Sequence, residues 1–170
     1  FVIEFEDIIS NYRMNPFDEE IGETTNEGGW EASEMRSYVN NEIYNAFPEE
    51  LRKLIIDTYV VSGHEHEKRE NYKTTDKIYL LSTKEVWEDG EENIIESDIA
   101  RDVTRQLDYY KQKGVTTSNY DGAIKDEEHW WLRSATAAEA YGFYEVMYNG
   151  CWSSFNVVNE SKGVSVAFRL

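Results

Sequence analysis

The pair Asn149-Gly150 restricts the fold of this chain more than any other feature of its sequence. A two-residue turn of type I′ needs positive φ at both central positions, and Asn-Gly adopts that conformation readily. Apolar and aromatic residues flank the pair over 143–148 and 151–158, which is typical of two strands. The pattern predicts a tight antiparallel hairpin in which Val146 lies opposite Ser153.

Helical patterns lie earlier in the chain. From Trp30 to Phe47, apolar residues recur every three or four positions, which predicts a helix with one buried face. Pro48 ends that helix and suits the first turn of a second one, because its missing N–H is not needed there. A third helix is expected over residues 98–113, with Gly114 as its C-cap.

Strand patterns dominate the last third. Residues 130–134 and 164–170 add two strands to those of the hairpin. Helices followed by an antiparallel sheet predict an α+β fold, and the length suits a single domain over 1–170. Residues 1–27 are then the first strand or an N-terminal extension. In the last strand, four alternating residues are expected to face the core: Val164, Val166, Phe168 and Leu170.

Two local patterns predict stabilising contacts. Ser82 and Glu85 have the spacing of a capping box, which indicates a short helix after Ser82. Trp130 and Trp131 point to opposite faces if they lie on a strand, so at least one belongs to the core. Arg133, just after them, is expected to pair with an acidic residue and hold loops together rather than to bind a ligand.

The charge of the chain excludes two classes of partner. Thirty-four acidic residues against seventeen basic ones give a net charge of −17. Nucleic acids and anionic membrane surfaces bind through Lys and Arg, so neither is an expected partner. No apolar run approaches the ~20 residues that span a bilayer. The sequence begins at Phe1 without a signal peptide, so we expect a piece of a longer product.

Metal and catalytic sites have weak support in the sequence. His64 and His66 alternate in a charged run, where a solvated loop is the expectation. Residues 88–93 carry oxygen ligands for calcium but lack the spacing of a helix-loop-helix site, so no cofactor is expected and calcium is the alternative. Cys151 has no partner for a disulfide. As a nucleophile it would need a base such as His129, which nothing in the sequence requires.

Ordered blocks along the chain carry a family resemblance. The main blocks are Gly28-Gly29-Trp30-Glu31, Phe47-Pro48-Glu49-Glu50-Leu51, residues 75–82, Trp130-Trp131-Leu132-Arg133-Ser134 and Gly163-Val164. Together, over residues 28–170, they resemble a bacterial family of uncharacterised domains common in gut Firmicutes. The ending also resembles the variable proteins of diversity-generating retroelements and, more distantly, the formylglycine-generating-enzyme branch of the C-type-lectin fold.

The resemblance implies a C-type-lectin-like fold, with N-terminal helices packed on a C-terminal antiparallel sheet. In the variable proteins, residues between two framework strands form a solvent-exposed ligand-binding face. Family members often end in Gly-Val-Arg-Pro-Ala-Phe, whereas this chain has Ser165-Val166, so the last loop departs from the pattern. Carried over to this chain, the binding face consists of Tyr141, Tyr144, Tyr148, Trp152, Ser154, Asn156 and Asn159.

The leading hypothesis is a non-catalytic recognition domain, secreted or at the cell surface, that binds a protein or glycan through the hairpin. The formylglycine-generating branch consists of enzymes whose catalysis resembles copper chemistry on a cysteine pair. This chain has a single cysteine, so the resemblance does not imply that activity. The calcium-dependent sugar motifs Glu-Pro-Asn and Trp-Asn-Asp are absent as well. A hydrolase-like enzyme using Cys151 or clustered carboxylates, or a structural spacer, are the alternatives.

Overall fold

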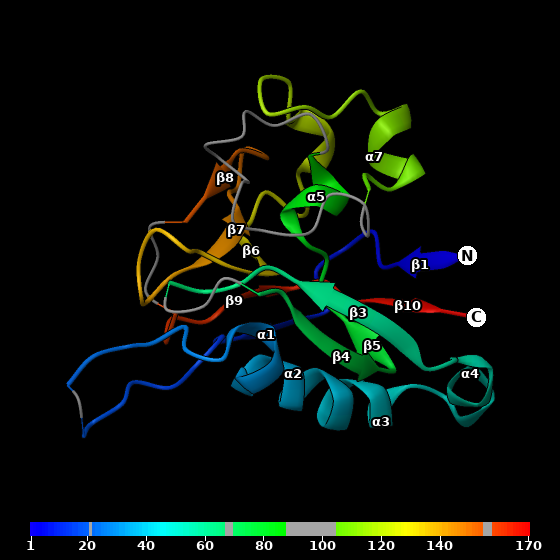
Figure 1. The fold of residues 1–170 in the computed structure, drawn as a ribbon. Helices are drawn as coiled ribbons and strands as arrows, with labels where there is room; N and C mark the ends of the chain where they lie inside the picture. The colour runs from blue at the N-terminus through cyan, green and yellow to red at the C-terminus, as the bar shows by residue number, and fades with distance from the viewer. Residues whose placement is uncertain (21, 67–69, 88–104, 155–157) are drawn as a thin grey trace.

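The structure is a computed structural model that describes residues 1–20, 22–66, 70–87, 105–154 and 158–170. The described residues form a mixed α+β fold with short helices and several largely antiparallel sheets (Figure 1). The α+β class expected from the sequence is therefore confirmed. Every helix in these ranges is too short or too polar to cross a membrane.

The two ends of the chain lie side by side (Figure 1). The first sheet has the order β1-β10-β5, so the last strand lies between the first strand and an internal one. Residues 1–27 therefore contribute strands that pair with the end of the chain. Residues 1–27 contain β1 (Val2–Glu4) and β2 (Ser10–Tyr12). Their partners and the internal strand are β5 (Ile78–Tyr79), β9 (Lys162–Val164) and β10 (Ala167–Arg169).

The single strand predicted over 164–170 is divided between two sheets. β9 pairs with β2 in the five-stranded sheet, and β10 pairs with β1 in the three-stranded sheet. The register changes because residues 5–9 form a longer connection than the Ser165-Val166 step opposite them. Val164, Val166 and Phe168 are buried as predicted, but Leu170 is 45% exposed, so its expected place in the core is wrong.

The helix predicted over 30–47 is interrupted. Ser33 adopts an extended conformation, and its side chain accepts a hydrogen bond from the Arg36 amide, so a new helix begins there. Trp30 and Met35 on the inner face are fully buried, whereas Ala46 lies on the exposed side. The segment consists of α1 (Gly29–Ala32), α2 (Glu34–Tyr38), the π-helical η1 (Val39–Ile43) and α3 (Tyr44–Ala46), followed after Pro48 by α4 (Glu49–Leu54).

The described residues in the middle of the chain form a hairpin and three short helices. The capping box of Ser82 and Glu85 is present as predicted. Of the helix predicted over 98–113, residues 98–104 lie outside the described residues. Residues 105–107 are not helical, so the described helix covers only Asp108–Gln112 and ends before Gly114, whose φ is 67°. The elements are β3 (Thr58–Ser62), β4 (Tyr72–Asp76), α5 (Thr83–Val86), α7 (Asp108–Gln112) and the 3₁₀-helix η2 (Asp121–Ala123).

Strand β6 (Trp130–Ala135) is the centre of the core, and all six of its residues are buried. It lies inside the five-stranded sheet, whose order is β2-β9-β6-β7-β8, between β9 and β7 (Phe143–Val146), and β8 (Trp152–Ser153) pairs with the far side of β7. Trp130 donates its indole N–H to the Ala123 carbonyl at 3.2 Å, and Trp131 donates to Tyr12 at 3.0 Å. Both tryptophans are therefore framework.

Candidate functional site

The hairpin at Asn149-Gly150 forms, but with a three-residue loop. The Met147 amide donates to the Cys151 carbonyl at 2.7 Å, and the Gly150 amide donates to Met147 at 2.8 Å. Gly150 alone has positive φ, at 85°, while the Asn149 side chain accepts from the Cys151 amide at 3.1 Å. This is the loop in which a left-handed residue follows an ordinary turn. The predicted two-residue turn is wrong because Asn149 caps the loop with its side chain.

The longer loop shifts the register of the hairpin by one residue. Val146 pairs with Trp152 rather than with Ser153. A shift of one residue moves a side chain to the other face of a strand. Trp152 is therefore on the face of Val146, partly buried against the core, instead of beside Met147.

The structure separates the residues that sequence reasoning placed on one binding face. Tyr141 and Tyr148 are 43% and 53% exposed, but they lie beyond opposite ends of β7, up to ~23 Å apart at the rise of a strand. Tyr144 is only 5% exposed, so its predicted ligand contact would need a rearrangement. The remaining predicted residues are half-buried or undescribed: Trp152, Ser154 and Asn159 are half-buried, and Asn156 lies outside the described residues.

A group of four side chains, which we call the tip cluster, surrounds the turn end of β7. It consists of Tyr148, His129, Glu145 and Lys162. The rings of His129 and Tyr148 lie 5.7 Å apart at 48°. The buried Glu145 carboxylate is 2.8 Å from the Lys162 ammonium and 3.5 Å from His129 Nδ1. Lys162 neutralises the buried charge, so the accessible part of the cluster is the aromatic pair.

The turn is anchored to a neighbouring segment. A Cβ added to Gly150 would lie 2.1 Å from the Tyr120 carbonyl oxygen, so only glycine allows this approach. The loop is thus pressed against the residues that precede and form η2. Contacts fix the register of the hairpin and hold Gly150 against the segment before η2. Tyr148 therefore lies on an anchored turn rather than on a free loop.

Asn26 organises the loop at the other end of β7. Its side-chain N–H groups lie 2.8–2.9 Å from the carbonyls of Thr136, Glu139 and Gly142, and Asn26 is 1% exposed. This loop carries Tyr141, whose pKa is raised mainly by a hydrogen bond with the neighbouring Glu139 carboxylate. Tyr141 is thus a second exposed aromatic residue on a fixed backbone.

The candidate metal sites at His64 and His66 and over residues 88–93 gain no support from the structure. His66 Nδ1 contacts the Ala137 carbonyl, and Tyr72 donates to Glu65, which is buried rather than part of the solvated loop expected there. Among the residues that the structure describes, no group of three His, Cys, Asp or Glu side chains could hold a metal ion. The possible calcium segment over 88–93 lies outside them.

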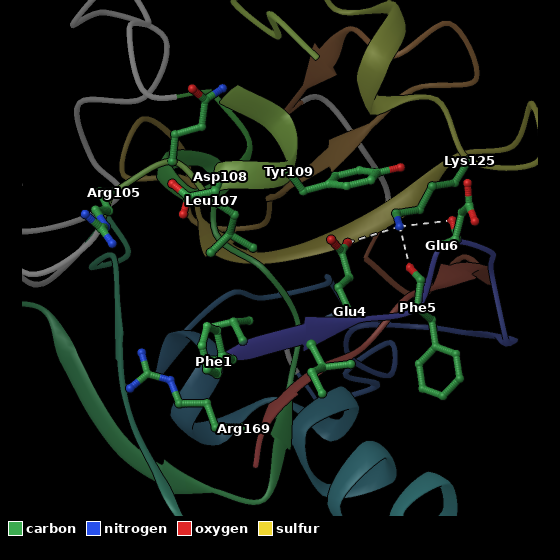
Figure 2. Close-up of a pocket in the computed structure, with 13 residues that line it drawn as sticks. Phe1, Glu4, Phe5, Glu6, Arg105, Leu107, Asp108, Tyr109, Lys125 and Arg169 are labelled. Atoms are coloured by element: carbon green, nitrogen blue, oxygen red, sulfur yellow. Dashed lines mark hydrogen bonds and ion pairs between the residues drawn. The ribbon is translucent and has the colours of Figure 1, made fainter. Parts of the chain in front are cut away.

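A cavity of about 800 Å³ runs along β1, and we call it the β1 groove (Figure 2). Glu4 lies in its wall and accepts a hydrogen bond from Tyr110 at 2.7 Å, with the Lys125 ammonium 3.1 Å away. Lys125 also donates to the Phe5 and Glu6 carbonyls at 2.6 and 3.1 Å. Burial raises the pKa of Glu4, and Lys125 and Tyr110 offset part of that rise.

Residues 6–170 match the family model described as Domain of unknown function (DUF6273). The chain belongs to this family. No curated protein and no solved structure matches it. The resemblance to a family of uncharacterised domains is therefore confirmed. The matched region of the DUF6273 chain includes the whole tip cluster, whereas β1 precedes it.

Sequence reasoning missed residues that shape the tip cluster, the β1 groove and the loop of Tyr141 in this DUF6273 domain. Lys162, Lys125 and Asn26 act on partners far away in the sequence, and none stands in a recognisable motif. Only Asn26 gave a local signal, since it precedes the turn-forming Gly28-Gly29 pair. His129 was weighed as a base for catalysis, but it lies against Tyr148 and Glu145.

Proposed function

We propose that this DUF6273 domain is a non-catalytic ligand-recognition domain that binds a protein or glycan through the turn of its β7–β8 hairpin. The observation that carries the proposal is the exposed Tyr148 on an anchored turn, with its ring packed beside the half-buried His129. Tyrosine offers a large contact area with few rotatable bonds, so a fixed, exposed tyrosine loses little entropy on binding.

The surroundings of the pair support a contact with a neutral or mixed surface. The chain carries a net charge of −17, but the acidic group beneath the pair, Glu145, is buried and paired with Lys162. A ligand at Tyr148 therefore meets an aromatic surface rather than an unpaired carboxylate. Trp152 and Ser154 on the same hairpin are half-buried, and Trp152 lies on the opposite face from Glu145, so Tyr148 is the main contact residue.

The proposal also covers the fold class of the domain and the kind of protein that contains it. We place it in the C-type-lectin-like class, in a secreted or surface protein of a gut bacterium, because its blocks resemble those of such families. Its segment between the framework strands corresponds to the diversified face of retroelement variable proteins. Of the residues expected on that face, Tyr141 and Tyr148 are exposed at opposite ends of β7, so Tyr148 would carry the contact at the turn.

The geometry around Cys151 favours recognition over catalysis. Cys151 is half-buried beside the turn. Within the described ranges, no histidine or carboxylate forms a hydrogen bond or ion pair with its side chain. A thiol needs such a neighbour to become a good nucleophile at neutral pH. The hydrolase-like alternative is therefore less well supported than binding.

The test is capture of ligands on an array of glycans and host proteins, with and without calcium. Tyr148→Ala should weaken binding of any captured ligand by about tenfold or more, while the thermal midpoint stays near that of the unmodified chain. Tyr59, 61% exposed on β3, gives the matched control, and Tyr59→Ala should bind normally. Capture of no ligand, or equal losses in both variants, would exclude the hairpin as the binding surface.

A further inference from the structure

Strand β1 lies at the edge of its sheet among the residues that the structure describes. In an antiparallel pair, residues alternate between those that bond the neighbouring strand and those that point away. The Phe5 amide donates to the Val166 carbonyl, so Phe5 and Ile3 face β10, and Val2 and Glu4 face the opposite side. In the part of the chain that the structure describes, the N–H and C=O groups of Val2 and Glu4 bond to no other residue.

The β1 groove lies along this free edge. Figure 2 shows β1 on one side of the cavity, with Leu107 and Tyr109 on the other. The Lys125 ammonium occupies one end, where it bonds the outward carbonyl of Glu6. The free backbone of Val2 and Glu4 therefore faces a space closed at one end and bounded by an apolar wall.

We propose that the β1 groove binds an extended peptide segment of a partner protein, which pairs with β1 as a fourth strand of the β1-β10-β5 sheet. An edge strand with unpaired backbone groups is a template for strand addition, and pockets beside the edge select side chains. The groove belongs to a different sheet from the hairpin, so this surface is independent of the proposed ligand face.

The charges along the groove define the peptide. Glu4, Glu6 and Asp108 are balanced by Arg105, Lys125 and Arg169, so the lining is neutral in a chain that is strongly acidic overall. Lys125 is paired with Glu4, whereas Arg169 stands opposite Val2 at the far end of the strand, where its side chain bonds the neutral hydroxyl of Tyr79 rather than a carboxylate. The peptide therefore carries a carboxylate near the Val2 end and apolar side chains facing Leu107 and Tyr109.

The test uses a synthetic array of eight-residue peptides and one proline variant. Val2→Pro removes an N–H that points into the groove, so β1 still pairs with β10 through Ile3. For the tightest peptide on the array, Val2→Pro should raise the Kd about tenfold or more, with an unchanged thermal midpoint. The matched control, Val2→Thr, keeps the N–H and should bind within about twofold of the unmodified chain.

Two further measurements separate strand addition from other contacts. Methylation of alternate peptide amides should abolish binding in one register and leave it intact in the other, because only one edge of a strand pairs. Hydrogen exchange at Val2 and Glu4 should be fast in the free chain and slow in the complex. Capture of no peptide, equal binding by Val2→Pro, slow exchange in the free chain, or dimerisation through β1 detected by light scattering would each overturn the proposal.

Discussion

Arg133 and Glu85 form an ion pair inside the core, with 2.5 Å between the guanidinium Nη1 and the carboxylate Oε2. The same carboxylate oxygen accepts the Ser82 amide at 2.9 Å, so one atom closes the capping box and holds the arginine. The guanidinium also donates to the carbonyls of Leu80 and Val61 at 2.7 and 3.0 Å. The pair thereby joins β6 to the start of α5 and to β3.

Removing one partner of this pair should destabilise the fold strongly. Arg133→Met leaves the Glu85 carboxylate and two carbonyls buried without their donor, and we expect a loss of about 3–5 kcal/mol in urea unfolding. The double variant Arg133→Met/Glu85→Gln removes the uncompensated charge and should recover part of that loss. A cost below about 1 kcal/mol for Arg133→Met would show that the pair is not a structural staple.

The close approach at the hairpin turn can be tested with two glycines. Gly150→Ala forces a left-handed alanine against the Tyr120 carbonyl and should cost about 2 kcal/mol or more. Gly114 also has positive φ, at 67°, but the nearest atom to an added Cβ lies 3.9 Å away. Gly114→Ala should therefore cost only about 1 kcal/mol. Equal costs in denaturant unfolding would mean that the Tyr120 contact is unimportant.

Asn26 should be essential for the loop that carries Tyr141. Asn26→Ala leaves the carbonyls of Thr136, Glu139 and Gly142 without this donor, and we expect a loss of about 1–3 kcal/mol. Limited proteolysis within residues 137–141 should become faster. The control is Asn41, which is exposed and bonds only within its own helix, and Asn41→Ala should change stability by less than about 0.5 kcal/mol. Unchanged proteolysis would contradict the role of Asn26.

Glu34 should make stability depend on pH in the acid range. Burial alone would raise its pKa, but hydrogen bonds from Tyr12 at 2.6 Å and from Arg13 outweigh burial and lower it below 4.5. A carboxyl whose pKa is lowered by folding stabilises the fold above its unfolded value, and this contribution is lost as pH falls through the folded pKa. The stability difference between the unmodified chain and Glu34→Gln should therefore shrink as pH falls below 4.5.

A second measurement identifies the cause of that shift. Tyr12→Phe removes the hydroxyl donor, so the pKa of Glu34 measured by NMR should rise toward its usual value. An unchanged pKa in Tyr12→Phe would assign the shift to Arg13 instead.

The features predicted correctly from the sequence depend on short-range chemistry. The capping box needs only Ser82 and Glu85 at the right spacing, and it forms. At least one of Trp130 and Trp131 was expected in the core because they point to opposite faces of a strand, and both are buried. Arg133 was expected to pair with an acidic residue, and it does. The capping box and the tryptophan pair depend on neighbouring residues, whereas the partner of Arg133, Glu85, lies 48 residues away and was not identified from the sequence.

The features predicted incorrectly depend on contacts with distant segments. The turn type was decided by the Asn149 side chain, which bonds the Cys151 amide in place of a left-handed backbone. Tyr144 was expected on an open face, but β7 is covered on both sides and all four of its residues are buried. Alternation along a strand indicates which residues share a face, but not whether that face is covered.

The position of β10 governs how the chain can assemble. The final strand is the middle member of β1-β10-β5, so neither neighbour can complete its ladder until residues 167–169 have been synthesised. Contacts between such distant parts of a chain are slow to form. A nascent chain must therefore keep β1 unpaired with β10 until residues 167–169 have left the ribosome, whereas β3 and β4 can pair as soon as residue 76 has done so.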